Sequence, residues 1–390
     1  MMSLFKRVYN IAKREIFSIV TKPVYLLSMV IAPLFCYIFF TTLMWSGLPS
    51  EMPVGIVDLD NTGTTRNIIR NLDAFQHTKI VNEYSDFTHA RKAIQKNQIY
   101  AFFYIPKGTT EKAISGRQPK ISFYTNYSYL VPGSLLYKDL RTMSELASGA
   151  ITRASLRAKG ANDQQAISFI QPVVINTHAL GNPWLNYSIY LSNSIIPGVL
   201  MLMIFLTTIY SVGSELKFGT QKEWLDKSGG SIIVALTGKL LPQTFIFFLM
   251  SLLYNIYLYG YLNFPCNCGI MTMILIGLLL VLASQGFGLF LIGLVPSLRL
   301  ALSIGCLWGV VSFSISGMSF PVMAMDAPLQ TLAYLFPLRS YFLLYVNFAL
   351  HGYSIIYAWL PLIIMIAFIS LPIFILKRLK NTMINYVYIP

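Results

Sequence analysis

The polar segment 214–230 carries the most distinctive side chains of the sequence. It reads SELKFGTQKEWLDKSGG and separates two long apolar stretches. Thr220 and Glu223 have the spacing of a capping box, in which a hydroxyl and a carboxylate each bond a free backbone N–H at the start of a helix. The pattern predicts a short helix over 221–227, ended by two glycines.

Trp224 and Leu225 are the apolar residues of that predicted helix, and charged residues surround them. An exposed aromatic patch on a charged helix favours the docking of a partner protein. The alternative is a turn that lies against a membrane with Trp224 at the interface, where tryptophan is common.

The sequence lacks the patterns of enzyme chemistry. A phosphate-binding loop needs G-x-x-x-x-G-K-[ST], so that backbone N–H groups and a lysine hold the phosphates. The nearest fragment, 230–240, has the wrong spacing and no hydroxyl after Gly238-Lys239. No Gly-x-Ser-x-Gly turn occurs, and the four histidines lie too far apart in sequence for metal-ligand spacing: His77, His89, His178 and His351. We expect no ATP hydrolysis, metal or cofactor in this chain.

The four cysteines do not predict a disulfide framework. Cys36 and Cys306 fall in apolar stretches, whereas Cys266 and Cys268 share a short loop. Two cysteines this close in sequence form a disulfide only with strain, and a zinc site needs more ligands nearby. We interpret all four as small apolar or incidental side chains.

The composition is that of an integral membrane protein. Hydrophobic residues make up 55% of the 390 residues and charged residues only 11%, whereas about a quarter of the residues of soluble domains are charged. The mean hydropathy is +0.60. Half of the formal charge of +14 lies beside apolar stretches at the two ends of the chain. The rest is spread along the sequence and accompanies no nucleic-acid motif, so we exclude a nucleic-acid partner.

Charge placement predicts the orientation in the membrane. Residues 1–23 form a basic amphipathic pattern before the first apolar stretch, and Lys377, Arg378 and Lys380 follow the last one. Because positive residues stay on the cytoplasmic side, both ends of the chain are expected there. We expect the first helix to lie in the membrane interface, and the apolar stretch after it to be an uncleaved anchor, since it is too long for a cleavable signal peptide.

Six apolar stretches reach the length of about 20 residues that a bilayer-spanning helix needs. Their predicted bounds are 24–45, 188–213, 240–262, 270–295, 300–320 and 355–376. The membrane body is then 186–376, and 377–390 is a cytoplasmic tail. The predicted spans contain essentially no ionisable residue, and Lys239 is expected to reach water at a cytoplasmic end. An ion path through the membrane is therefore not predicted.

Residues 46–185 alternate strand and helix patterns, which predicts an α/β sheet domain. Strands are predicted at 53–57, 79–81, 99–105, 120–124 and 171–177, and helices at 64–72, 86–96, 109–114 and 134–159. The domain lies between two spans and is expected on the extracytoplasmic, periplasmic side. The predicted fold is a membrane all-α bundle of six transmembrane helices with an inserted extracytoplasmic α/β domain.

Segment 321–354 is too apolar for a free loop, yet prolines interrupt it. Gly317 precedes it, and Pro321, Pro328 and Pro337 are expected to break it into short helices. Irregular backbone at membrane depth is tolerated where protein buries it. The pattern predicts a broken outer hairpin that enters the outer leaflet.

Three groups of residues match one known family pattern: Glu215 with Gly219-Thr220 after the second span, Ser316-Gly317 to Pro321 with Pro337-Leu338 around the outer hairpin, and Val54 to Asn61 with Ile105 to Gly108 in the inserted domain. In these places the chain resembles ABC-2 type permease subunits, in the subgroup of bacterial drug-efflux-like exporters with a large periplasmic domain between the first two spans. It departs from them at 217–222, where relatives often carry a denser Arg/Glu run.

The resemblance implies a permease that forms a homodimer or heterodimer and docks a separate ATP-binding cassette ATPase, which holds the ATP and Mg. A periplasmic membrane-fusion protein would continue the route outward from the bacterial inner membrane. The spans are rich in Phe, Tyr, Leu and Met, which suits a hydrophobic or amphipathic substrate, although lipid contact explains them equally well. Membrane lipids are further partners, and no substrate-lining residue is assigned.

The resemblance also implies two sets of site residues. The ATPase-coupling residues are Glu215, Phe218, Gly219, Thr220, Glu223, Trp224 and Leu225. The outer broken hairpin contributes Gly317, Pro321, Pro328 and Pro337.

Two other functions fit parts of the sequence. A non-transporting membrane sensor or assembly factor, with a ligand-binding outer domain, would share the layout but would not depend on an ATPase. An ion-coupled antiporter ranks last, because such transporters usually need ionisable groups within the membrane.

Overall fold

The computed structural model describes residues 4–115 and 117–385 of the chain. Its contacts divide into two compact units. Unit 1 holds the chain up to Trp45 and from Ala179 onward, and unit 2 is Ser46–His178. The predicted interface helix at 1–23 and the predicted tail at 377–390 each extend outside the described residues, at 1–3 and 386–390.

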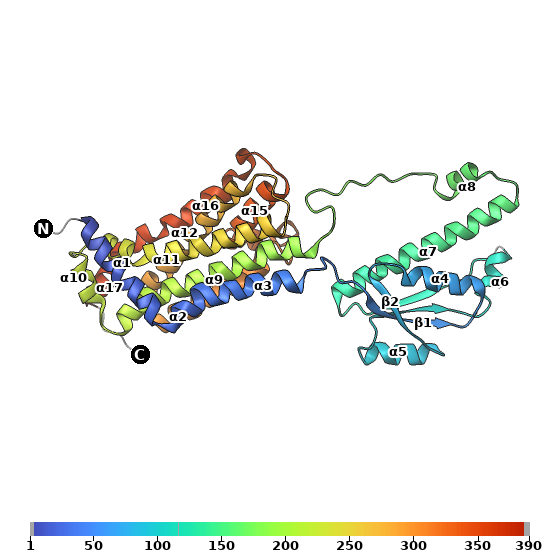
Figure 1. The fold of residues 1–390 in the computed structure, drawn as a ribbon, viewed down its shortest axis with the longest axis horizontal. Helices are drawn as coiled ribbons and strands as arrows, with labels where there is room; N and C mark the ends of the chain where they lie inside the picture. The colour runs from blue at the N-terminus through green and yellow to red at the C-terminus, as the bar shows by residue number, and fades with distance from the viewer. Residues whose placement is uncertain (1–3, 116, 386–390) are drawn as a thin grey trace. The chain divides into compact units, whose positions relative to one another are not determined.

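Unit 1 is helical throughout its regular structure (Figure 1). Its first helices are α1 (Leu4–Thr21), α2 (Pro23–Leu26), η1 (Leu27–Ile31) and α3 (Ala32–Leu43). After unit 2 follow α9 (Tyr187–Lys217), α10 (Gln221–Lys227), α11 (Ile232–Asn255), η2 (Ile256–Tyr261), α12 (Ile270–Leu294) and α13 (Leu298–Ile315). The last group is η3 (Val322–Ala324), α14 (Ala327–Ala333), α15 (Pro337–Tyr345), η4 (Val346–Leu350), η5 (Ile355–Ala358), α16 (Trp359–Ser370), η6 (Leu371–Ile375) and α17 (Leu376–Asn385).

Within the described residues, six helical stretches are long and apolar enough to cross a membrane, which confirms the predicted number. They are Pro23–Leu43, Tyr187–Lys217, Ile232–Tyr261, Ile270–Leu294, Leu298–Ile315 and Ile355–Asn385. The fifth ends at Ile315, before its predicted end at 320, whereas three others extend past their predicted bounds by a turn or more. Glu215 and Lys239 consequently lie inside long helices.

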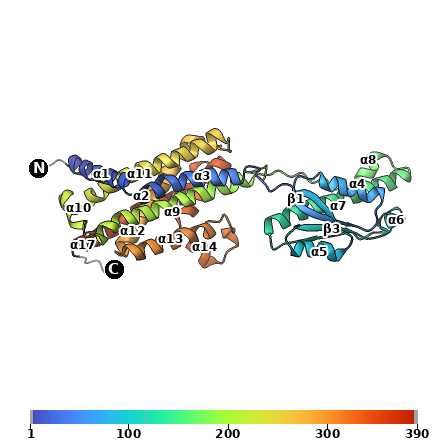
Figure 2. The ribbon, with the colours of Figure 1, turned by 60° about the horizontal axis from the view of Figure 1, so that its bottom comes forward.

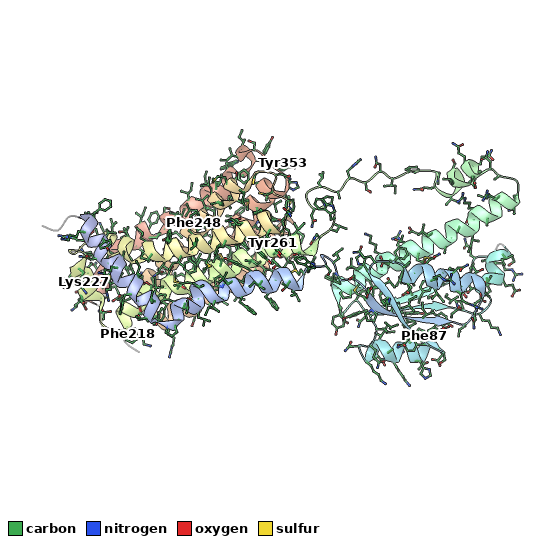
Figure 3. The ribbon with its side chains drawn as sticks, viewed as in Figure 1. Phe87, Phe218, Lys227, Phe248, Tyr261 and Tyr353 are labelled. Atoms are coloured by element: carbon green, nitrogen blue, oxygen red, sulfur yellow. The ribbon has the colours of Figure 1, made fainter. Side chains whose placement is uncertain are left out.

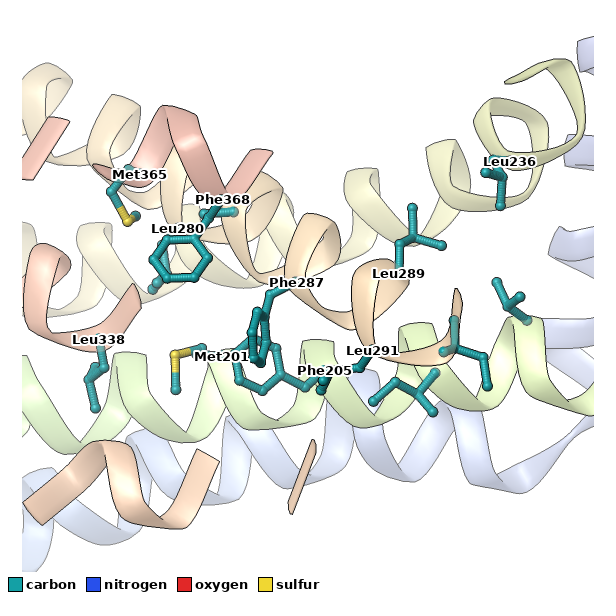
Figure 4. Close-up of a cluster of buried hydrophobic side chains, with 14 of the residues drawn as sticks. Met201, Phe205, Leu236, Leu280, Phe287, Leu289, Leu291, Leu338, Met365 and Phe368 are labelled. Carbon is teal, nitrogen blue, oxygen red and sulfur yellow. The ribbon is translucent and has the colours of Figure 1, made fainter. Parts of the chain in front are cut away.

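The core of unit 1 depends on close contacts between helices. A side chain at Gly286 of α12 would approach the carbonyl oxygen of Phe368 in α16 to 2.3 Å, so the two helices meet backbone to backbone. The rings of Phe205 in α9 and Phe287 in α12 lie 5.0 Å apart, centre to centre. Figure 4 shows this pair within the buried apolar cluster.

Unit 2 is a four-stranded sheet with helices on both faces. The strands are β1 (Met52–Asp58), β2 (Thr78–Glu83), β3 (Ala101–Ile105) and β4 (Ser122–Thr125), in the order β2-β1-β3-β4. β1 runs parallel to β2 and β3, and β4 is antiparallel to β3. The helices are α4 (Gly63–Asp73), α5 (Phe87–Gln95), α6 (Thr109–Ile114), α7 (Leu130–Ala158) and α8 (Asp163–Ile170).

Side-chain alternation along the strands sorts these residues into two layers. Ile56 and Phe103 face α4 and α7, whereas Val57 and Phe102 face α5. Figure 1 shows α4 and α7 on one side of the sheet and α5 on the other. The mixed α/β class predicted for this segment is confirmed.

The predicted closing strand at 171–177 is wrong, because these residues have no regular secondary structure. Pro172 cannot donate a ladder hydrogen bond, and both edge strands of the sheet pair only with their inner neighbours. Just before it, α8 was not anticipated. Its signal was present, since Asn162 and Gln165 form a capping box there.

Candidate functional site

A buried cluster of charged and polar side chains joins three helices at one end of unit 1. On α1, the positions Ile11, Glu15 and Ile19 recur every four residues, so they share one face of the helix, and all three are buried. That face packs against α11. A side chain at Gly238 would come within 2.8 Å of Ile11, so the two helices approach closely here.

Two further polar pairs at i, i+4 spacing face this side of α1. Ser211 and Glu215 lie in the last two turns of α9, and Lys239 and Gln243 lie in α11. All four side chains are buried. In each of α9 and α11, two polar side chains one helical turn apart therefore face Glu15.

The ammonium of Lys239 bridges two carboxylates. It lies 2.8 Å from Oε2 of Glu15 and 2.8 Å from Oε1 of Glu215. It also lies 5.0 Å from the ring centre of Trp224, within the range of a cation–π contact. The Arg14 guanidinium donates to Oε2 of Glu215 at 2.9 Å.

Neutral groups complete the cluster around Glu15. The amide nitrogen of Gln243 donates to Oε1 of Glu15 at 2.8 Å and to Oγ of Ser211 at 2.8 Å. The Ser211 hydroxyl donates to the same carboxylate at 3.2 Å. Two carboxylates, one ammonium and one guanidinium balance in charge, which is the condition under which buried ions are tolerated.

The connection from α9 to α10 ends directly on this cluster. Gly219 has φ +73°, a left-handed conformation that glycine adopts without strain. It turns the chain so that the Thr220 hydroxyl donates to Glu215. The predicted capping box is wrong, because Thr220 makes no side-chain cap and Glu223 bonds elsewhere.

The predicted exposed patch of Trp224 and Leu225 is also wrong. Trp224 is 0% exposed and belongs to the same buried cluster as Ile11, Leu216 and Leu379. Both apolar side chains of α10 thus anchor it to unit 1. Phe218, just before α10, is an exposed aromatic side chain at this end, at 64% exposure.

The outward face of α10 is charged. Lys222, Glu223, Asp226 and Lys227 are all exposed, and Lys227 donates to Glu223 at 2.5 Å. That hydrogen bond holds the pKa of the Glu223 carboxyl below its usual 4.5. Figure 3 labels Phe218 and Lys227 at the end of unit 1 where α10 lies, and in Figure 2 the helices α1, α10 and α17 gather there.

The hairpin residues lie at the other end of α13. Gly317 has φ +95° just after this helix ends. Pro321 precedes η3, Pro328 lies in the first turn of α14, and Pro337 begins α15. The short helices therefore begin at or beside the predicted prolines, where a missing N–H costs least.

Sequence reasoning missed Arg14, Glu15, Ser211, Lys239 and Gln243 as site residues. The i, i+4 pairs were the available signal, together with the single acidic residue of the basic α1. The expectation that Lys239 reaches water is wrong, since it is 3% exposed. The ion-coupled antiporter was ranked last partly because no buried ionisable residue was expected. The burial of Glu15, Glu215 and Lys239 removes that reason.

Metal chemistry has no support from the described side chains. Across residues 4–115 and 117–385, no group of three or more His, Cys, Asp or Glu side chains is placed to hold a metal ion. The sulfur atoms of Cys266 and Cys268 lie 3.9 Å apart, and both cysteines are free.

The six apolar helices define a multi-pass membrane protein, and buried charges join two of them, α9 and α11, to α1 beside the short helix α10. A family model described as ABC-2 family transporter protein matches residues 23–376, so the chain belongs to the ABC-2 transporter family. A search of curated proteins finds no match. Members of this family are membrane components of transporters rather than catalysts, and they generally work with an ATPase in a dimeric arrangement. The resemblance to ABC-2 type permeases is confirmed.

Proposed function

We propose that this chain is the permease subunit of an ATP-binding cassette exporter, driven by a separate ATPase that docks on Phe218 and the charged face of α10. The observation that carries the proposal is the charged cluster directly behind that face. α10 is anchored through Trp224 and Thr220 to side chains of α1, α9 and α11. A displacement of α10 would therefore be transmitted to α1, α9 and α11 together.

The cluster suits the transmission of movement because its contacts are short and directional. Lys239 holds Glu15 of α1 and Glu215 of α9 at 2.8 Å each. Separating Lys239 from Glu15 would leave a buried carboxylate with only the neutral donors Gln243 and Ser211, which costs several kcal/mol. The helices consequently favour moving together over sliding apart.

The rest of the proposal concerns route and setting. The permease would form a homodimer or heterodimer in the bacterial inner membrane, with both chain ends and α10 in the cytoplasm and 46–185 in the periplasm. It would move a hydrophobic or amphipathic substrate outward, and a membrane-fusion protein would receive it. The positive residues that flank the first and last spans support this orientation.

Affinity purification of the tagged full chain from its own membranes tests the docking surface. We expect a phosphate-loop ATPase to co-purify with the wild type and to be lost from Phe218→Asp. Phe169→Asp, at a residue 76% exposed in unit 2, is the matched control and should retain the ATPase. Equal ATPase recovery with both variants would reject the docking surface, and no ATPase with the wild type would favour a sensor or assembly factor.

A further inference from the structure

Two free cysteines lie side by side at the hairpin end of unit 1, away from the charged cluster. Cys266 and Cys268 belong to the loop between η2 and α12, and their sulfur atoms are 3.9 Å apart. Both are half-buried and unbridged. In Figure 3 this loop follows the labelled Tyr261, the last residue of η2. The sequence alone predicts incidental side chains here, whereas the structure brings the two sulfurs into contact.

Hydrogen bonds to another segment hold the two sulfurs in place. The N–H of Gly269 donates to the Cys266 carbonyl at 3.2 Å, which closes a tight turn around both cysteines. Asn267, between them, fastens this turn to η4. Its backbone N–H donates to the Ala349 carbonyl at 2.9 Å, and its side-chain amide donates to the Leu350 carbonyl at 2.7 Å. The sulfur pair is therefore positioned by the hairpin segment rather than by a free loop.

The surroundings favour a thiolate on Cys268. It directly precedes Gly269, the N-cap of the 25-residue helix α12, and the positive end of a helix dipole stabilises a thiolate. The Cys266 S–H donates to the Cys268 sulfur and lowers the pKa of the Cys268 thiol below its usual 9.0. The same hydrogen bond, together with burial, raises the pKa of the Cys266 thiol. One nucleophilic sulfur thus lies beside one sulfur that keeps its proton.

A thiolate next to a second thiol is equipped for exchange with a disulfide. The Cys268 thiolate attacks one sulfur of a disulfide RSSR, the S–S bond of that compound breaks, and RS⁻ leaves. The released RS⁻ takes the proton of Cys266. The Cys266 thiolate then attacks the Cys268 sulfur and expels the second RS⁻. The two cysteines are oxidised to one disulfide, and RSSR is reduced to two thiols.

The oxidised pair would be easy to reduce again. A disulfide between residues two apart departs from the preferred Cα–Cα and Cβ–Cβ distances and is strained. Closing the sulfur separation from 3.9 Å to a bond also moves Asn267, whose two hydrogen bonds to η4 oppose the change. Strained disulfides are the labile ones, so the chemistry suits reversible exchange rather than a permanent bridge.

We propose that Cys266 and Cys268 form a thiol–disulfide exchange site for small disulfides, in which Cys268 attacks and Cys266 resolves the mixed disulfide. The compound is small because both cysteines pack against the buried apolar cluster, which leaves little room for a folded protein at either sulfur. In the orientation proposed above, the loop faces the periplasm, where disulfides persist. The exchange itself depends neither on this orientation nor on export.

Dithiodipyridine is a suitable probe, because each exchange step releases one thiopyridone that absorbs in the near ultraviolet. The full chain would be tested in detergent with Cys36→Ala and Cys306→Ala, which remove the other two thiols. We expect two thiopyridones per chain and an intact mass lower by two hydrogens, with no pyridyl adduct. An adduct retained on both cysteines, or no reaction, would overturn the site.

Single replacements test the two roles. Cys266→Ser should release one thiopyridone, keep the adduct on Cys268 and react roughly tenfold more slowly at pH 7, because the donor that stabilises the thiolate is lost. Cys268→Ser has the same number of thiols and is the matched comparison. It should react several-fold more slowly still, since Cys266 is farther from the α12 N-terminus. The reverse order, or three equal rates, would overturn the assignment.

The lability of the disulfide is read on the chain without these single replacements, so this test stands even if one of them fails to fold. After oxidation by dithiodipyridine, reduced glutathione should return the chain to two thiols, as counted by maleimide addition and intact mass. A disulfide that resists glutathione would be a structural bridge and would overturn the exchange site.

Discussion

The two ends of unit 1 are built in opposite ways. At the α10 end, helices are joined by charged side chains that pair with one another, with Lys239 between Glu15 and Glu215. At the hairpin end, Gly317 and three prolines stop and restart the helices, and Arg339 donates to a backbone carbonyl, that of Ser316, at 2.9 Å. The first end resists separation of its helices, whereas the second is divided into short pieces.

This difference suits a protein that receives a movement at one end. Charge pairs transmit a displacement only while both partners stay in place, so the α10 end should be intolerant of changes in charge. The hairpin end should be sensitive to backbone conformation instead. The variants below test the two expectations from the largest effect to the smallest.

Replacement of Lys239 should give the largest loss of stability. Lys239→Met leaves two buried carboxylates without their shared cation, at an expected cost of about 3–5 kcal/mol. Thermal unfolding of the purified chain in detergent measures it. Lys222→Met, at an exposed position of α10, is the control. Equal melting temperatures for the two variants would show that the cluster contributes nothing beyond surface charge.

Alanine substitution of two glycines with positive φ compares the loss of stability at the two ends of unit 1. Gly317→Ala should cost about 2–3 kcal/mol, because backbone strain adds to the displacement of the Arg339 guanidinium from its hydrogen bond with the Ser316 carbonyl. Gly219→Ala meets nothing within 4 Å, so only the strain of φ +73° counts, about 1 kcal/mol. Denaturant unfolding gives both values, and a larger loss at Gly219 would reverse the comparison.

The smallest expected effect is the titration of Glu223 on the outer face of α10. Its carboxyl has a lowered pKa because Lys227 donates to it. The ionised form is thus favoured by folding, and this contribution is present above the usual 4.5 and lost as pH falls through the folded value. Carboxyl ¹³C shifts should place the pKa below 4.5, and Lys227→Met should return it toward that value. A wild-type pKa at or above 4.5 would contradict the pairing.

Features set by neighbouring residues were predictable from the sequence. The strands β1 and β3, the helices α4 and α5 and the number of apolar helices depend on local pattern, and the structure contains them. The short helix α10 was also predicted, from a capping box at its start that does not form and from the two glycines that end it. In each case the residues that decide the outcome lie within a few positions of one another.

The charged cluster was not predictable in the same way. Lys239 meets Glu15 across 224 positions of the chain, and neither residue alone shows that it is paired. The sequence placed Lys239 at a helix end, where it would ordinarily reach water. Trp224 was misjudged for the same reason, since its burial depends on α1, α9 and α17 arriving from elsewhere. The segment 171–177 has strand composition but no pairing strand, a fact that pattern alone does not reveal.

The most direct test of the central claim, that the cluster passes movement from α10 to the spans, uses Glu15→Gln. This change keeps the side-chain shape and lies away from the exposed face of α10, while it removes one charge that Lys239 holds. ATP hydrolysis and substrate export would be measured in the same proteoliposomes with the ATPase bound. We predict that export per ATP falls several-fold while ATPase binding is unchanged. An unchanged ratio of export to ATP hydrolysis, with the ATPase still bound, would contradict the account.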